Sequence, residues 1–271
     1  MKLLIKAIVS LLLIGYCVLL YIFGNLVATA GISVFIFGCL YEFYGLCEKL
    51  QLKPLKILGL SITCCLICEA YINNLEGMLH ILLITVFFTF LLLVLNKNHG
   101  HNAFLDGAVT IFGLIYIVVP MCHLILLCVH PSQGKPGGLD FFIFIILCNS
   151  VCDMCANGIG SWFGKTRILS HVSPSKTLEG TVGGMIMAVL VSIPAGYLIK
   201  FPLIHSLFAG LTIAVSGVVG DFSESLIKRC AGVKDTANVF VEHGGMMDRC
   251  DSLFMSSFFF YFYLYYFFWH N

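Results

Sequence analysis

Long apolar runs, separated by short polar stretches, make up most of this chain. Nine runs approach the length that crosses a bilayer, about 17–25 residues. They span residues 3–24, 26–46, 56–72, 78–95, 103–128, 139–160, 180–199, 203–220 and 249–269. The hydrocarbon interior offers no water to backbone groups, so runs of this length are expected to be helical. The pattern predicts an all-α integral membrane protein with about nine transmembrane helices.

Two of these runs contain a proline. Pro120 lies in the fifth run and Pro194 in the seventh. Proline lacks a backbone N–H and clashes with the preceding turn, so we expect a kink in both helices. The stretch 131–138 is rich in Pro and Gly, which predicts a linker between an N-terminal and a C-terminal part.

Lysine and arginine are unevenly distributed among the connections. With nine spans, 13 of the 15 Lys and Arg residues fall on the side of the N-terminus, and only Lys135 and Lys200 fall on the other. Cytoplasmic loops of membrane proteins are enriched in these residues. We therefore expect a cytoplasmic N-terminus, with the loops 161–180 and 221–248 also facing the cytosol.

The composition supports this class. Hydrophobic residues make up 59% of the chain and the mean hydropathy is +0.99, which excludes an ordinary soluble domain. The net charge of +1, without a basic tract, gives no indication of nucleic-acid binding. Cys152 and Cys155 have the spacing of a zinc pair, but no second pair follows at a usual distance, so we predict no thiolate metal site. Glu42, Glu48 and Glu69 are expected to be interfacial.

The stretch 221–251 concentrates charge between the last two apolar runs. It holds six carboxylates, four cationic side chains and His243. If 221–229 is helical, one face carries Asp221, Glu224, Ser225 and Lys228, with Arg229 alongside. Asp248 and Asp251 stand one turn apart, a spacing that suits a hard cation, and nearby Lys and Arg suit a polyphosphate. Metal, phosphate and membrane suggest phosphoryl or nucleotidyl transfer on a lipid; the simpler alternative is a solvated charged loop.

Two further polar features precede this stretch. Asn149, Asp153 and Asn157 form a stripe on the sixth run, which either lines a polar cavity or holds the helix bundle together. In the loop 161–180, Lys and hydroxyl side chains precede a helix expected to begin at Gly180. A helix N-terminus with such neighbours favours phosphate binding, although a positively charged cytoplasmic loop would look similar.

Several of these motifs together resemble the phosphatidate cytidylyltransferases (CDP-diacylglycerol synthases). They are Ser225-x-x-Lys228-Arg229, Lys234-Asp235, His243-Gly244-Gly245-x-x-Asp248-Arg249-x-Asp251, Ser173-Pro174-x-Lys176-Thr177-x-Glu179-Gly180 with Gly183-Gly184, and Asp153-x-x-Ala156. The likeness covers roughly residues 140–257. One departure is Val241-Glu242, where the family usually has Pro-Gly.

The resemblance implies the site residues and their roles. Asp221, Asp248 and Asp251 would hold Mg²⁺ or another divalent cation such as Mn²⁺, with Asp248 also counted as catalytic. Lys228, Arg229, Lys234 and His243 complete the implied catalytic set. The implied substrate-binding set comprises Ser173, Lys176, Thr177, Ser225, Lys228, Arg229, Lys234 and Arg249.

The resemblance also implies partners and a location. CTP and phosphatidic acid would be the substrates, surrounded by membrane lipid, and nucleic acid is not expected. Family members are thought to form homodimers, which these residues do not demonstrate. The expected location is the inner (cytoplasmic) membrane, as a multi-pass protein. On this reading residues 1–130 hold about five N-terminal transmembrane helices, and 139–271 form the catalytic region with a polar cavity.

Other functions fit parts of the pattern. Transfer to another lipid phosphate, or a CTP-dependent polyprenol or phytol kinase, would use a related site, although the complete motif series argues against the kinases. The intramembrane acids could line a cation transport path, but the sequence shows no internal repeat of the kind expected for a transporter. An inactive homologue is the remaining alternative, because of Val241-Glu242.

Overall fold

The computed structural model describes residues 15, 22–72, 76–95, 102–129, 137–170, 172–237 and 244–269. Within these ranges the chain is helical apart from its connections, and the extended pairing found among these residues is an isolated bridge between Arg167 and Thr177. The predicted all-α class is confirmed. Away from its ends, an α-helix satisfies its backbone hydrogen bonds internally, as a lipid environment requires.

Six helical stretches of the described chain are long and apolar enough to cross a membrane. They are Asn25–Lys49, Met78–Leu95, Ala103–Val129, Gly138–Phe163, Leu178–Leu198 and Leu203–Cys230. The predicted first run, 3–24, lies almost entirely outside the described residues. The runs at 56–72 and 249–269 form helices but are not among the six, so nine crossings and the cytoplasmic N-terminus stay predictions.

Contacts divide the chain into two compact units. The first unit comprises Met1–Leu126 and Cys230–Cys250, and the second comprises Leu127–Arg229 and Asp251–Asn271. The charged stretch is therefore shared between them. The division by contacts does not bear on catalysis, so the assignment of the catalytic region to residues 139–271 stays a prediction.

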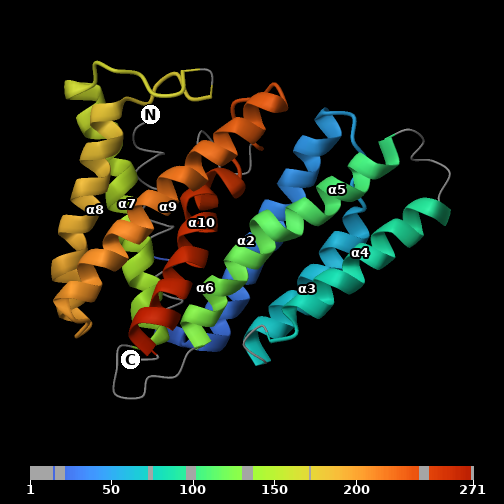
Figure 1. Cartoon of the computed structure of the whole chain (residues 1–271), viewed down its shortest axis with the longest axis horizontal. Coiled ribbons are helices and arrows are strands. Elements are labelled where there is room, and N and C mark those ends of the chain that lie inside the picture. Colours follow the sequence, from blue (N-terminus) through green and yellow to red (C-terminus); the bar gives the residue numbers. More distant parts are fainter. Residues whose placement is uncertain are drawn as a thin grey trace. The chain divides into compact units, whose positions relative to one another are not determined.

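The first unit is built from α2 (Asn25–Lys49), α3 (Lys56–Ile72), α4 (Met78–Leu95) and a long helix (Figure 1). That helix runs through α5 (Ala103–Gly113), the π-helical η2 (Leu114–Val118) and α6 (Val119–Val129), whose last residues enter the second unit. Pro120 is the second residue after the π-helical turn. A π-helical turn is a known site of helix bending, so regular α-helical bonding is interrupted close to Pro120. Pro194 lies inside α8, and the kinks expected at both prolines stay predictions.

Tyr44 lies at the centre of the first unit. Its side chain is fully buried, and its hydroxyl donates to the Thr110 carbonyl at 2.9 Å, joining α2 to α5. The connection between α2 and α3 is held to the same helix, because the Lys53 amide donates to Asp106 at 2.6 Å and the Leu55 amide to the Thr110 hydroxyl at 2.9 Å. These hydrogen bonds pair the buried Tyr44, Asp106 and Thr110 side chains with partners on neighbouring segments, as burial demands.

The second unit contains α7 (Gly138–Phe163), α8 (Leu178–Leu198), α9 (Leu203–Cys230), most of α10 (Met247–Leu264) and the π-helical η3 (Tyr265–Trp269). Helices α7 and α8 pack closely through small residues. A Cβ atom at Gly184 would lie 2.5 Å from the Cys152 carbonyl oxygen and 2.8 Å from the Ala156 Cβ. Close approach through glycine and alanine is typical of helix pairs in membranes.

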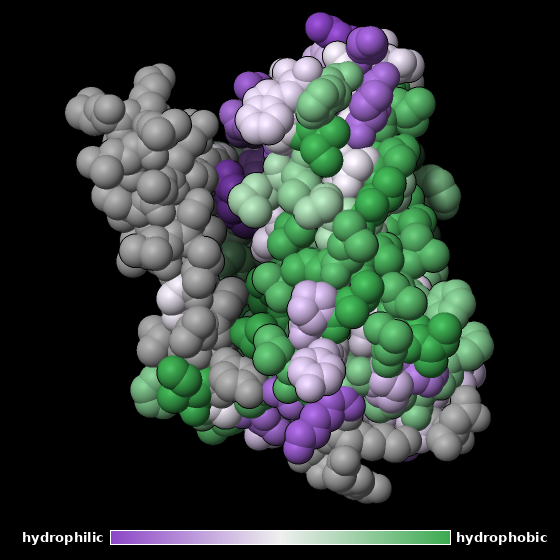
Figure 2. Space-filling model, turned by 90° about the vertical axis from the view of Figure 1, so that its left-hand side faces the viewer, coloured by the Kyte–Doolittle hydropathy of each residue, from purple (hydrophilic) through white to green (hydrophobic). Residues whose placement is uncertain are grey.

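The exposed surface formed by α8 and α9 is largely apolar. Figure 2 shows a broad hydrophobic face with hydrophilic residues gathered towards its ends. Exposed apolar side chains of α8 and α9 include Val182, Ile186, Leu190, Leu198, Leu203, Phe208, Leu211, Val215 and Val219. Such an extended apolar surface suits contact with lipid chains rather than with water.

Candidate functional site

Polar side chains from four segments of the second unit gather around Lys176. The Lys176 ammonium forms an ion pair with the Asp221 carboxylate, and lies 4.6 Å from the centre of the Phe222 ring. Lys176 comes from the loop before α8, whereas Asp221 and Phe222 come from α9. The pair joins two residues of the predicted site that are 45 positions apart in the sequence.

The polar stripe of α7 faces α10. The Asn149 amide donates to the Ser256 hydroxyl at 2.8 Å, and the Ser252 hydroxyl donates to the Asp153 carboxylate at 3.2 Å. The partners are spaced four residues apart on both helices, so one helix face meets the other over a full turn. Asn149 is buried in the helix interface, which supports a role in holding the helices together. Asp153 lies near Lys176, which supports a role in lining a polar site.

Ser252 also contacts Asp251. The Asp251 carboxylate accepts from the Ser252 amide at 2.7 Å, and lies 3.3 Å from the Ser252 hydroxyl oxygen. A hydroxyl carries one proton, so it serves either Asp153 or Asp251 at a time. Ser252 therefore links two carboxylates of the cluster. Sequence reasoning missed it, although its position one residue after Asp251 offered a signal.

Charge around Lys176 is predominantly negative. Burial lowers the pKa of Lys176, while the carboxylates of Asp251, Asp153 and Glu224 act in the opposite direction. The ammonium of Lys228 adds to the lowering. With Asp221, four carboxylates surround two lysines in this cluster. An anionic substrate entering it would require further positive charge.

The C-terminal turns of α9 are helical, which confirms the face predicted for 221–229. Lys228 forms an ion pair with Glu224 one turn earlier, and the Glu224 side chain is fully buried. The Arg229 side chain donates through Nε to the Val172 carbonyl at 3.1 Å, which fastens the loop before α8 to the end of α9. Ser225 lies half-buried on the same helix. Helix α9 continues to Cys230, so the connection that follows it begins at residue 231.

The loop before α8 is shaped by its own hydrogen bonds. Thr177 is the N-cap of α8, accepting from the Gly180 amide at 3.2 Å, so the helix begins at Leu178 rather than at Gly180. The Glu179 carboxylate accepts from the amides of Lys165 at 3.0 Å and Thr166 at 3.1 Å. Ser173 is buried in this loop. Capping explains the local fold, and the substrate-binding roles of Ser173 and Thr177 stay predictions.

Asp248 belongs to the first unit and is held by the segment before it. Its Oδ2 accepts from the Gly245 amide at 2.7 Å, the Thr236 amide at 3.0 Å and the Thr236 hydroxyl at 2.8 Å. Lys234 and Arg249 are both exposed. His243 and Val241-Glu242 lie outside the described residues, so their predicted roles are not addressed by the structure.

The predicted metal ligands are the three carboxylates of Asp221, Asp248 and Asp251. Carboxylate oxygens are the donors that Mg²⁺ and Mn²⁺ prefer, so the residue types fit. In the described part of the chain, no three His, Cys, Asp or Glu side chains come together in a group that could hold a metal ion. Asp221 and Asp251 belong to the second unit and Asp248 to the first. The metal set therefore stays a prediction.

A second missed residue is Glu42. Expected at an interface near a helix end, it lies inside α2, is 8% exposed, and accepts three hydrogen bonds from the segments around Asp248. A carboxylate within an apolar run was the available signal, because such a residue needs buried partners.

These features define a class of protein. In the described residues, six helices are able to cross a membrane, and acids of α7, α9 and α10 gather with Lys176 and Lys228 in a partly buried cluster, which is the mark of a functional site in a membrane protein. The chain belongs to the Cytidylyltransferase family, whose sequence model matches residues 4–267. By its name this is a family of nucleotidyltransferases, as the motifs predicted.

Individual relatives agree with the family match. YnbB of Escherichia coli, an uncharacterised protein, is 38% identical over 159 residues, covering 58% of this chain and 53% of the relative. A phosphatidate cytidylyltransferase of Synechocystis is 38% identical over 125 residues, covering 45% and 42%. A phosphatidate cytidylyltransferase of Staphylococcus saprophyticus is 29% identical over 245 residues, covering 86% and 90%. The chain thus spans about half the length of the first two and most of the third.

Proposed function

We propose that this protein transfers CMP from CTP to phosphatidic acid, giving CDP-diacylglycerol and pyrophosphate for phospholipid synthesis. The observation that carries the proposal is the family match, which extends over residues 4–267 rather than over one motif. The names of the Synechocystis and Staphylococcus relatives supply the lipid substrate. The second unit supplies a partly buried cluster of the charges that this chemistry needs.

The transfer exchanges one phosphorus–oxygen bond for another. An oxygen of the phosphatidate phosphate forms a bond to the α-phosphorus of CTP, and the bond between that phosphorus and the bridging oxygen of pyrophosphate breaks. The nucleophile is already ionised, so a strong general base is not required. The main obstacle is repulsion between two anionic substrates, which fixed cations can offset.

Lys176 and Lys228 are the lysines best placed for this role in the second unit. Both are already held by carboxylates, Lys176 by Asp221 and Lys228 by Glu224. An incoming phosphate would take the place of the carboxylate beside each ammonium. The lysine side chains would therefore need little rearrangement on binding. Lys234 and Arg249, exposed in the first unit, are second candidates for substrate phosphates.

The surplus of carboxylates supports a divalent cation as cofactor. Lys176 is surrounded by Asp153, Asp221, Glu224 and Asp251, a set that would repel anionic substrates unless a cation neutralised it. We propose that Asp221 and Asp251, with Asp248 one turn earlier on α10, hold Mg²⁺ or Mn²⁺. When bound, such an ion polarises a phosphoryl oxygen and neutralises a leaving pyrophosphate.

The proposal includes a location. The protein would be a multi-pass protein of the inner (cytoplasmic) membrane, with its site on the cytosolic side. CTP would then arrive from the cytosol, and phosphatidic acid from the surrounding lipid. The uneven distribution of lysine and arginine supports this orientation.

A transfer assay tests the proposal. Purified protein in detergent is mixed with CTP, phosphatidic acid and Mg²⁺, and cytidine is measured in the lipid extract. We expect cytidine in lipid only when all three are present. A polyprenol in place of phosphatidic acid serves as the competing acceptor, and transfer to it alone would contradict the proposed substrate.

A further inference from the structure

Glu42 lies in α2, far in sequence from the residues of the predicted site. Its side chain is 8% exposed, within a helix of the first unit that is otherwise mostly apolar. A carboxylate in such a position is expensive unless hydrogen bonds replace its lost hydration. The identity of its donors therefore indicates why the residue is present.

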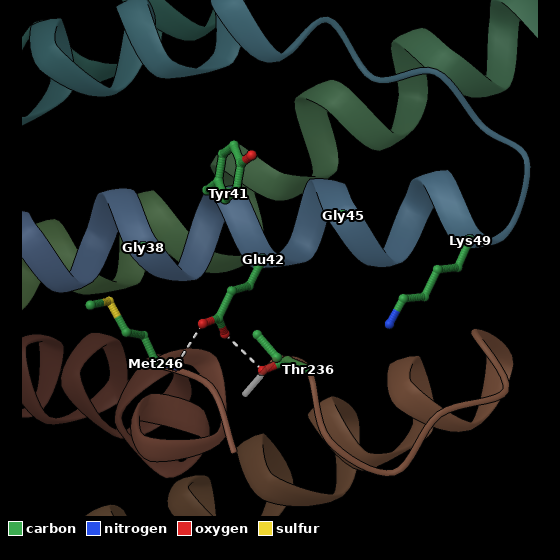
Figure 3. Close-up of a pocket in the computed structure, with 8 residues that line it drawn as sticks. Gly38, Tyr41, Glu42, Gly45, Lys49, Thr236 and Met246 are labelled. Atoms are coloured by element: carbon green, nitrogen blue, oxygen red, sulfur yellow. Dashed lines mark hydrogen bonds between the residues drawn. The ribbon is translucent and has the colours of Figure 1, made fainter. Parts of the chain in front are cut away.

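All three donors come from the segments that flank the predicted His-Gly-Gly motif. Glu42 accepts from the Thr236 hydroxyl at 2.7 Å, the Met246 amide at 2.8 Å and the Met247 amide at 3.0 Å (Figure 3). The last two amides stand at the start of α10, where backbone N–H groups have no partner within the helix. The negative charge of Glu42 also faces the positive end of the α10 dipole.

Thr236 connects Glu42 to Asp248. The Thr236 hydroxyl oxygen lies 2.7 Å from Glu42 Oε2 and 2.8 Å from Asp248 Oδ2. Because a hydroxyl has a single proton, it can donate to only one of these oxygens at a time. When the Thr236 hydroxyl donates its hydrogen bond to Glu42, Asp248 is able to accept a hydrogen bond from another partner. Glu42 keeps its two backbone donors in either arrangement.

Gly245 shows how closely these groups fit. A Cβ atom at this position would collide with the Glu42 carboxylate and with the Thr236 hydroxyl. The Gly245 amide donates to Asp248 at 2.7 Å. The turn before α10 is thus fitted to the two carboxylates, and a side chain at Gly245 would displace at least one of them.

We infer that Glu42 is a positioning residue for the proposed reaction. It fixes the first turn of α10 through two amides, and it sets the Asp248 carboxylate through the Thr236 hydroxyl. Its proposed action is through Thr236 and the start of α10 rather than on a reacting group. It gives the N-terminal helices, which carry none of the recognised motifs, a specific part in forming the site. The expected effect on kcat rests on the proposed function, whereas the expected effect on the structure around α10 does not.

The structural consequence is measured by hydrogen exchange of the full-length protein in detergent. In Glu42→Ala, we expect the amides of Met246 and Met247 to exchange about 10–100-fold faster, as amides that have lost a charged acceptor would. Exchange in α7 and α8 should stay unchanged. The matched control is Glu48→Ala on the same helix, which loses only an exposed pair with Lys56 and should leave all these rates as they are.

The kinetic consequence is measured on Thr236, since Thr236→Val removes the hydroxyl and Thr236→Ser keeps it. We expect Thr236→Val to lower kcat about 10–100-fold with little change in KM for CTP, and Thr236→Ser to restore most of the rate. If Glu42→Ala does not fold, the comparison of kcat between the two Thr236 variants still tests whether the hydroxyl positions Asp248. Unchanged exchange at 246–247 in Glu42→Ala, or equal kcat values in the two Thr236 variants, would overturn the inference. An inactive wild type with altered exchange in Glu42→Ala would instead refute the proposed function alone.

Discussion

Lys176 pairs with Asp221, although one residue lies in the loop before α8 and the other lies on α9. The pair is partly shielded, with side-chain exposures of 25% and 20%. It holds the loop and the helix together before any substrate is present. Each partner therefore has a structural role beside its proposed role in binding, and experiments must separate the two.

Replacing Lys176 should affect both activity and stability. In Lys176→Met, Asp221 loses its ion-pair partner, so we expect the free energy of unfolding to fall by about 1–3 kcal/mol. CMP transfer should fall as well, because a cation for substrate phosphate is missing. Thermal unfolding in detergent and the transfer assay give the two values.

The double variant Lys176→Met/Asp221→Asn separates the two effects. It removes both charges of the pair, so stability should return towards that of the wild type while transfer stays low. Lys200→Met is the matched control, since Lys200 is exposed in the connection between α8 and α9. Recovery of transfer in the double variant would show that Lys176 acts only structurally.

Asp248 and Asp251 should determine the response to divalent cations. In Asp248→Asn or Asp251→Asn, a carboxylate oxygen is replaced by a weaker amide donor, so we expect weaker Mn²⁺ binding and loss of transfer. Mn²⁺ binding is measured by electron paramagnetic resonance on the purified protein. Asp235→Asn, at an exposed position of the same charged stretch, is the control and should bind Mn²⁺ as the wild type does. Unchanged Mn²⁺ binding in both variants would remove the metal assignment.

The interface between α7 and α8 should tolerate no added atom at Gly184. A methyl group there would press against the Cys152 carbonyl and the Ala156 side chain, so Gly184→Ala should lower stability by about 1–3 kcal/mol. Gly158→Ala makes the same change where, apart from the adjacent residues and the backbone of its own helix, nothing lies within 4 Å of the new Cβ, and it should be neutral or slightly stabilising. The midpoints of thermal unfolding of the two variants give the comparison, and equal values would argue against this packing.

The predicted orientation can be read with reporter fusions. Alkaline phosphatase is active only outside the cytoplasm, whereas β-galactosidase is active only inside it. We expect alkaline phosphatase to be active when it is fused after residue 135, and β-galactosidase to be active when it is fused after residue 167. The distribution of lysine and arginine places these two connections on opposite sides of the membrane. The reverse pattern would place the proposed site outside the cytosol and contradict access for CTP.

Much of the fold followed from local properties of the sequence. Uninterrupted apolar runs predicted helices such as α4 and α8, and Pro120 indicated where regular α-helical bonding is disturbed. The pairing of Lys176 with Asp221 could not be predicted, because it depends on how the loop before α8 packs against α9, 45 positions further along the chain. The partners of Glu42 could not be predicted for the same reason, since its donors lie about two hundred positions away.

The most direct test of the proposed activity follows two labels in CTP. With α-phosphate label, we expect radioactivity to enter the lipid extract in a reaction that requires phosphatidic acid and a divalent cation. With γ-phosphate label, we expect the radioactivity in pyrophosphate and none in lipid, because the broken bond lies between the α- and β-phosphorus atoms. Lipid labelled from the γ-phosphate would indicate a kinase, and lipid labelled from neither position would contradict CMP transfer altogether.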